Sequence, residues 1–458
     1  MTNVKVIEEN KEKVLLVGVY ETGAYNEGGR GKRETEEEFY HSMDELSELA
    51  SACGMRAVGQ VIQRMERTHN ALYLGPGKLD EVIERAEFLE AELIIFNDTL
   101  SPSQLRNLQK TLDMPVMDRT ALILEIFRKR ARSSEAKLQV ELASLNYLKP
   151  RLIGITPAMT RQGGTSGSMS SRGAGEKKLE LDRRRIDHRL AELRHDLKEI
   201  VSERETQRKK RRSSRLPLVS LVGYTNAGKS TLMNRMLEIF GNDREGCDKN
   251  VYEADMLFAT LDTSVRRICT GNNMDFLLSD TVGFIHKLPT ALVEAFKSTL
   301  EEAKEADLII QVIDYSDPYH YEHMKVTEET LAELGAGHIP SVIVYNKCDK
   351  CVPEVDYPKR IKGMRDNASN APRDCIYISA KDDASIEAFK DLILEKIYSD
   401  YVNASLLIPY DKGAVLSYFM ENANVVESDY TENGTLISVR CHKADAEKYA
   451  QYIVQKNI

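Results

Sequence analysis

The chain has 458 residues, too many for one ordinary hydrophobic core, so about three domains are expected. Its 42% hydrophobic and 29% charged residues exclude a disordered chain. No apolar run approaches the ~18 residues of a membrane helix, and the first residues lack the apolar segment of a signal peptide. Seven scattered cysteines favour a reducing compartment. We therefore expect a monomer of the cytoplasm without a membrane span, with peripheral membrane association as the alternative.

Charge is distributed unevenly along the chain. The net charge of −9 argues by itself against binding to nucleic acid. Residues 128–215, however, contain 24 Lys and Arg against 11 Asp and Glu, a net charge of +13, which leaves −22 for the remainder. This split predicts an acidic protein with one basic arm, and the acidic surfaces would orient that arm toward RNA.

Residues 1–128 alternate between strand-like and helix-like segments, which predicts a small α/β domain with a parallel sheet. The expected strands are 14–20, 55–61, 93–96 and 116–117, and the expected helices are 37–50, 78–89 and 102–112. Ser101 is the expected N-cap of the third helix, and Gln104 completes a capping box.

From Thr120 the sequence predicts long, charged and uninterrupted helix. One apolar stripe precedes a break, and a second recurs after it at spacings of four, three, four and three residues, which is typical of a coiled-coil seam. These stripes are Leu138, Leu142 and Leu145, then Ile186, Leu190, Leu193, Leu197 and Ile200. We therefore expect a long antiparallel helical hairpin over 129–215.

The segment 151–178 is the expected tip of this hairpin, because it is rich in Gly and Ser and contains one acidic residue. An isolated charge run is usually a solvated loop. Two basic segments at the ends of one rigid hairpin instead favour contact with single-stranded or folded RNA. The expected RNA contacts are Arg151, Arg161, Arg172, Lys177 and Lys178.

The segment LVSLVGYTNAGKST has the order of a strand, a loop and the start of a helix, and it matches the phosphate-binding loop pattern. Backbone N–H groups would surround the β-phosphate of a nucleotide. Lys229 would reach the β- and γ-phosphates, and the Ser230 hydroxyl would bind Mg²⁺. The expected phosphate-binding residues are Gly223, Tyr224, Thr225, Asn226, Ala227, Gly228, Lys229, Ser230 and Thr231.

The segment DTVGF follows an apolar strand and supplies the second phosphate element. Asp280 would hold Mg²⁺ through water, and the Gly283 N–H would contact the γ-phosphate. Thr260 is the expected hydroxyl that completes the Mg²⁺ shell in the triphosphate state, with Thr263 as the alternative. Lys229, Thr260 and Gly283 are therefore the expected catalytic residues.

Two further strand ends would recognise the base. Asn346, Lys347 and Asp349 end the first, and the Asp349 carboxylate can accept from the ring N–H and the amino group of guanine. Adenine lacks this donor pair, so the site would reject it. The second strand end brings Ser379, Ala380 and Lys381 beside the base. Residues 216–400 are thus expected to form a Ras-like P-loop domain that binds GTP with Mg²⁺.

Four residues could carry other chemistry. Cys348 and Cys351 form one Cys-x-x-Cys, a weak zinc or redox signal inside the base-recognition motif. His320 and His323 could share a helix face, but without a third ligand nearby they are expected on the solvated surface.

Residues 401–458 are expected to form a small C-terminal α/β domain, with a helix at AVLSYFM and a strand at GTLISVRCH.

With these motifs in place, the chain resembles the HflX family of translational GTPases. The matching text is LGPGKLDE, DRTALILEIF, EAKLQVELASLNYLKPRL, GGTSG, ELDRRRI and DTVGFI, within residues 10–400. The family usually has RGPGET where 172–177 read RGAGEK, proline at Thr263 and often arginine at His286. LGPGK could be a second nucleotide site, but a helix N-terminus or an RNA-backbone contact is the preferred interpretation.

The resemblance implies a ribosome-associated GTPase that binds the large ribosomal subunit and its RNA and splits stalled or idle ribosomes in the GTP form. The alternative is a GTP-gated RNA-binding or ribosome-assembly factor with incidental hydrolysis.

Ras-like GTPases place a water-orienting glutamine after Asp-x-x-Gly, where this chain has Phe284. His286 is a weak substitute, so the backbone, a monovalent cation or a docked partner is expected to position the water.

Overall fold

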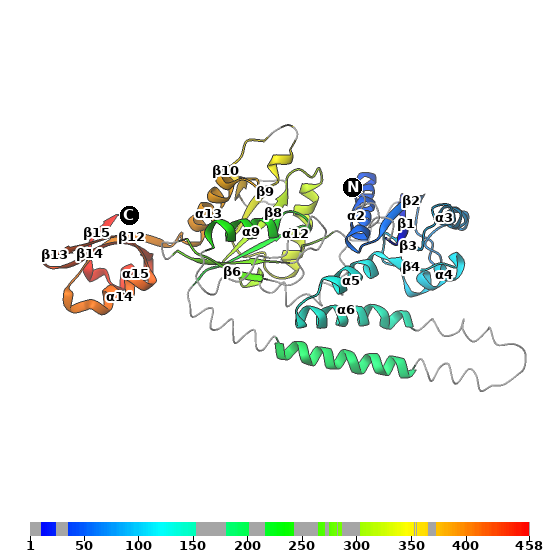
Figure 1. Cartoon of the computed structure of the whole chain (residues 1–458), viewed down its shortest axis with the longest axis horizontal. Coiled ribbons are helices and arrows are strands. Elements are labelled where there is room, and N and C mark those ends of the chain that lie inside the picture. Colours follow the sequence, from blue (N-terminus) through cyan, green and yellow to red (C-terminus); the bar gives the residue numbers. More distant parts are fainter. Residues whose placement is uncertain are drawn as a thin grey trace, which may run out of the picture. The chain divides into compact units, whose positions relative to one another are not determined.

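A computed structural model describes residues 11–23, 35–152, 180–200, 216–241, 264–270, 274–281, 283–285, 303–351, 353, 355–364 and 372–457 (Figure 1). These residues belong to two compact units, one containing the chain up to Glu205 and the other most of the chain from Thr206 onward. None of the helices in the described ranges has both the length and the apolar character that a membrane span requires.

The first unit contains a parallel sheet in the order β2-β1-β3-β4, as the sequence predicted. Its strands are β1 (Lys13–Glu21), β2 (Arg56–Met65), β3 (Leu93–Phe96) and β4 (Val116–Asp118). Its helices are α2 (Glu36–Ala52), α3 (Pro76–Phe88), α4 (Pro102–Leu112) and α5 (Arg119–Arg130). The capping box of Ser101 and Gln104 at α4 is confirmed, and Gly75 is the N-cap of α3. Strand β2 runs four residues past its predicted end because it pairs with β1 as far as Met65.

The predicted uninterrupted helix after Thr120 is wrong, because the chain breaks between α5 and α6 (Ser134–Leu152). Ala131 ends α5 with an extended backbone, at φ −60° and ψ 115°. The Ser133 hydroxyl then accepts the Ala136 N–H at 3.1 Å, which is N-cap geometry and restarts the helix.

A helix over 180–200 lies antiparallel beside α6 (Figure 1). Arg189 donates to both carboxylate oxygens of Glu141, at 2.7 and 2.9 Å, and Lys149 pairs with Asp187 at 2.5 Å. Leu190 and Leu193 are buried, whereas the side chains around them on the other faces are exposed. The second apolar stripe predicted from the sequence therefore faces the protein.

The second unit contains a seven-stranded sheet in the order β10-β11-β9-β8-β5-β7-β6, in which only the edge strands β10 and β6 are antiparallel to their neighbours. Residues that alternate along the strands face two cores: Val312 packs under the helices α9 and α13, and Ile313 packs under α12. The bounds are β5 (Leu218–Gly223), β6 (Ser264–Ile268), β7 (Phe276–Asp280), β8 (Leu308–Asp314), β9 (Ser341–Asn346), β10 (Lys359–Met364), β11 (Arg373–Tyr377), α9 (Lys229–Phe240), α12 (His320–Glu333) and α13 (Asp383–Ile397).

The last part of the second unit is an antiparallel sheet in the order β13-β14-β12-β15. Phe419, Ile437 and Leu406 lie in its core, so the predicted helix and strand both bury apolar side chains. The bounds are β12 (Tyr401–Ile408), α14 (Gly413–Asn422), β13 (Asn424–Thr431), β14 (Gly434–His442), α15 (Lys443–Lys448) and β15 (Ile453–Asn457). The predicted mixed α/β fold is confirmed.

Candidate nucleotide-binding site

The predicted phosphate loop connects the buried strand β5 to the start of α9, and two of its positions require glycine. Gly223 has φ 150°, and a Cβ there would lie 2.2 Å from the carbonyl oxygen of Val312. Gly228 has φ 92°, and its Cβ would lie 2.3 Å from Nδ2 of Asn346. Any other residue would be strained and would push the loop away from its neighbours.

Lys229 lies at the centre of this loop with its ammonium group buried. Its Nζ donates to the carbonyl oxygens of Gly223 at 3.0 Å and Tyr224 at 2.7 Å. Burial lowers the pKa of Lys229 to about 8; the charge of Lys347 lowers it as well, and that of Asp280 opposes the shift. A phosphate would offer this ammonium a charge-assisted partner in place of neutral carbonyls.

Ser230 and Asp280 bring a hydroxyl and a carboxylate together next to Lys229. The Ser230 Oγ donates to Asp280 Oδ2 at 2.7 Å, and Asp280 is fully buried at the end of β7. The next residue, Thr281, donates from Oγ1 to the Leu221 carbonyl at 2.7 Å, which fixes this strand end to β5. A hydroxyl and a carboxylate at hydrogen-bonding distance are the hard oxygen ligands that Mg²⁺ prefers.

The DTVGF segment is joined to the phosphate loop through its backbone. Phe284 donates its N–H to the Gly223 carbonyl at 3.1 Å, and its carbonyl accepts the Thr225 N–H at 2.8 Å. A Cβ on Gly283 would lie 2.8 Å from Cα of Thr225, so a side chain there would separate the two segments. The Phe284 side chain is 2% exposed, so it packs in the interior.

The sequence predicts GTP hydrolysis, and replacing Phe284 with glutamine should fail to raise its rate to that of Ras-like GTPases. The backbone bonds direct this side chain into the interior, so the amide would be buried there at a cost of about 3 kcal/mol in stability. Phosphate-release assays and thermal melting would test this expectation. A Phe284→Gln variant that melts normally and hydrolyses GTP faster than the wild type would contradict it.

Asn346 connects the phosphate loop to the predicted base-binding residues. Its Nδ2 donates to the Ala227 carbonyl at 3.0 Å, and its Oδ1 accepts the Ala380 N–H at 3.0 Å. Asn346 is 1% exposed, so both bonds are shielded from water. One amide thus holds two loops from distant parts of the sequence in a fixed relation.

Asp349 is held at the base side by the third loop. Its Oδ1 accepts the Ser379 hydroxyl at 2.8 Å, and its Oδ2 lies 3.4 Å from Lys381 Nζ. Burial raises the pKa of Asp349, but the bonds from Ser379 and Lys381 outweigh it and leave the pKa below its usual value. The carboxylate is therefore ionised at neutral pH. Lys347 pairs with Asp314 at 2.8 Å from a left-handed backbone with φ 62°.

Comparison with known proteins decides the family. Three family profiles match in chain order: GTP-binding GTPase N-terminal over 40–128, GTP-binding GTPase Middle Region over 130–211, and 50S ribosome-binding GTPase over 218–347. GTPase HflX of Caldanaerobacter subterraneus subsp. tengcongensis is 39% identical over 450 residues, which cover 98% of this chain and 95% of that protein. This chain belongs to the HflX family. It is a GTPase.

Two further known proteins are similar to this chain. GTPase HflX of Escherichia coli (strain K12) is 36% identical over 406 residues, covering 89% of this chain and 90% of that protein. The crystal structure of a GTP-binding protein from the archaeon Sulfolobus solfataricus in complex with GDP is 22% identical. The match covers 85% of this chain and 98% of the chain in that structure, with a TM-score of 0.40.

Most of the predicted nucleotide-site residues of this HflX chain come together at one edge of the seven-stranded sheet. The phosphate loop, Asp280, the Asn346 motif and the Ser379 motif follow the carboxyl ends of β5, β7, β9 and β11. Other predicted residues lie outside the described residues: Thr260, Thr263, His286, Arg161, Arg172, Lys177 and Lys178.

Arg151, one of the predicted RNA contacts, makes several bonds within the first unit. Its guanidinium lies 3.5 Å from the centroid of the Tyr147 ring and donates to the Leu100 carbonyl at 2.7 Å. It also donates to Asp118 Oδ2 at 3.2 Å, and its side chain is only 11% exposed. Arg151 therefore holds the end of α6 against the parallel sheet, and its contact with RNA stays a prediction.

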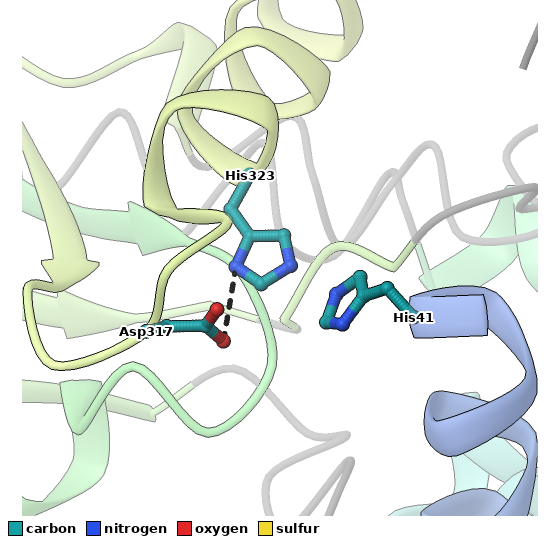
Figure 2. A group of neighbouring side chains, drawn as sticks. All are labelled: His41, Asp317 and His323. Atoms are coloured by element: carbon teal, nitrogen blue, oxygen red, sulfur yellow. Dashed lines mark ion pairs between the residues drawn. The ribbon is translucent and has the colours of Figure 1, made fainter. Parts of the chain in front are cut away.

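His323 differs from its prediction, because it is buried and not solvated. Its ring stacks on Tyr224 of the phosphate loop, with centroids 3.7 Å apart and an interplanar angle of 11°. Its Nδ1 lies 3.7 Å from Asp317 Oδ2 (Figure 2). Its place on the helix face that also carries Met324 and Leu331 could have indicated burial.

Cys348 and Cys351 are free thiols. Burial raises the pKa of Cys348 to about 12, whereas a reactive thiol has a lowered pKa. Within the described part of the chain, neither cysteine belongs to a group of side chains that could hold a metal ion. The burial of Cys348 indicates a packing role for that side chain.

Proposed function

We propose that this HflX chain binds GTP with Mg²⁺ in the described site, and that its GTP form binds the large ribosomal subunit and splits stalled or idle ribosomes. The nucleotide part rests chiefly on Asn346, which links the phosphate loop to the base side through buried bonds. The ribosome part is supported by the family profile and by the +13 charge of residues 128–215. We propose that the protein acts in the cytoplasm, where it would meet ribosomes.

Each side chain has a proposed role in nucleotide binding. Lys229 would exchange the carbonyls of its own loop for the β- and γ-phosphates, and the Gly283 N–H would meet the γ-phosphate. Ser230 and Asp280 would hold Mg²⁺, with Thr260 as the further ligand in the triphosphate state. Bound there, Mg²⁺ would neutralise phosphate charge. Asp349 would accept the two guanine N–H groups, with Lys347, Ser379, Ala380 and Lys381 around the base.

Hydrolysis by the isolated protein should be slow, because Phe284 offers no hydrogen bond to the attacking water. The expected rate is on the order of 10⁻⁴ to 10⁻³ per second, as for intrinsic Ras-type turnover. The positioning group would then come from the backbone, from a monovalent cation or from the docked subunit. We propose that the ribosome supplies or orders it.

The experiment is to measure GTP turnover by the protein alone, with large subunits and with intact ribosomes, while scoring subunit separation. We expect large stimulation, and separation even with a non-hydrolysable GTP analogue. Stimulation without separation, or a preference for immature particles, would favour the GTP-gated binding or assembly factor. No stimulation by any particle would contradict both proposals.

The basic tip can be tested in the same assay. Neutralising Arg161 and Arg172 to alanine should impair splitting and leave nucleotide binding unchanged. Arg184 and Arg185 are matched controls, since their side chains are 72% and 80% exposed on the helix over 180–200, outside the expected tip. Normal splitting by the tip variant would contradict a role for the tip.

We also propose that the chain is divided into four functional parts, with the bounds 1–128, 129–215, 216–400 and 401–458.

A further inference from the structure

The phosphate loop is held from the side by α12, in a contact that the proposed nucleotide chemistry does not use. The ring of Tyr224 lies flat against the imidazole of His323, 3.7 Å between centroids, and the two side chains are nearly excluded from water. Both residues belong to the second compact unit. A stacked pair at this distance restricts the rotation of both side chains.

Asp317 and Thr327 fix the His323 side of this stack. Asp317 Oδ2 lies 3.7 Å from His323 Nδ1, and the Asp317 Oδ1 accepts the N–H of Tyr319 at 2.8 Å (Figure 2). One turn further along α12, the Thr327 hydroxyl donates to the His323 carbonyl at 2.9 Å. The Asp317 contact thus lies at the imidazole itself, and the Thr327 bond lies within the helix that carries it.

The Tyr224 side of the stack is the part of the loop that handles the phosphates. Its carbonyl accepts the ammonium of Lys229 at 2.7 Å. Its neighbours Gly223 and Thr225 exchange backbone hydrogen bonds with Phe284 at 3.1 and 2.8 Å. The ring that stacks on His323 therefore belongs to the backbone segment that holds Lys229 and joins DTVGF.

We propose that His323 is a positioning residue for the nucleotide: its stack on Tyr224 preorganises the phosphate loop and slows nucleotide release. This inference rests on the proposed binding of guanine nucleotide at this loop. A loop that is already ordered loses less conformational freedom when it binds. Removing the stack should accelerate GDP release about three- to tenfold, which corresponds to the usual contribution of an aromatic pair.

The test is stopped-flow dissociation of a fluorescent N-methylanthraniloyl GDP from the full chain. His323→Leu should release it about three- to tenfold faster than the wild type, whereas His323→Phe keeps a flat ring and should restore slow release. Tyr321→Leu removes an aromatic ring from the exposed face of the same helix, where it is 47% exposed, and should change nothing. Asp317→Asn separates the contribution of the neighbouring carboxylate from that of the stack.

A spectroscopic readout accompanies the rates. The imidazole protons of His323 should show an upfield ring-current shift in NMR spectra of histidine-labelled protein, and Tyr224→Leu should abolish it. Should His323→Leu fail to fold, Tyr224→Leu tests the same stack from the loop side with the same expected acceleration.

Two results would overturn the proposal. One is unchanged GDP release in a variant that has lost the ring-current shift. The other is release from His323→Phe as fast as from His323→Leu, because stacking would then not be the property that matters. A wild-type protein that does not bind GDP would instead contradict the proposed function, so the two failures are distinguishable.

Discussion

Replacing Asp349 with asparagine is expected to reduce the GTP affinity of this GTPase by about 10⁴-fold and to create affinity for xanthosine triphosphate. The ionised Asp349 carboxylate presents two acceptors, one held by Ser379 at 2.8 Å and one near Lys381. Guanine offers two N–H donors to such a group. The NH₂ of asparagine would face the amino group of guanine, so two donors would oppose each other. Xanthine has a carbonyl oxygen in place of that amino group, and this oxygen can accept from the asparagine NH₂.

Equilibrium titration with fluorescent GTP and xanthosine analogues measures both sides of this exchange. Binding of the xanthosine analogue by Asp349→Asn shows that the variant is folded, so the lost GTP affinity reports the base contact alone. Lys350→Ala serves as the matched control, because Lys350 is the next residue of the same turn, is exposed and has no assigned contact with the base. Wild-type GTP affinity in Asp349→Asn would place the guanine away from this carboxylate.

The sequence predicted the parallel sheet of the first unit and the strand-end motifs of the second because both depend on local spacing. A strand, a glycine-flanked loop and a helix start within fourteen residues leave few alternatives for the backbone around Gly223 and Gly228. The Ser101 capping box is equally local, since the side chain bonds to a backbone N–H three residues away.

The internal contacts of Arg151 and the burial of His323 could not be predicted from the sequence, because both environments come from distant segments. Arg151 bonds to Asp118, thirty-three residues earlier in the chain, whereas its immediate sequence neighbours offer no acidic partner. His323 is buried by a loop about one hundred residues earlier. The break at Ala131 has another cause: Ser133 competes for helix initiation where the surrounding composition favours continuous helix.

The second large effect is expected from Arg119, which is buried in the first unit among α2, β3 and α5. Its guanidinium forms an ion pair with Glu45 and donates to Asn97 Oδ1 at 2.9 Å and the Ser42 carbonyl at 3.3 Å. The side chains of Arg119 and Glu45 are only 2% and 5% exposed. Arg119→Met should destabilise this unit by about 3–5 kcal/mol, because the Glu45 carboxylate loses its charge partner in a site shielded from water.

Hydrogen–deuterium exchange of peptides from α2 and β3 in the full chain measures the local unfolding of this unit. It does not assume that the two units unfold together. Arg128→Met is the matched control on α5, since its ion pair with Glu125 is at the surface and should leave exchange unchanged. Because the penalty comes from an unpaired carboxylate, the double variant Arg119→Met with Glu45→Met should recover much of the lost protection. A double variant as unstable as Arg119→Met would instead assign the stability to the hydrogen bonds with Asn97 and Ser42. The guanidinium would then stabilise the unit mainly as a hydrogen-bond donor, and its charge would contribute less.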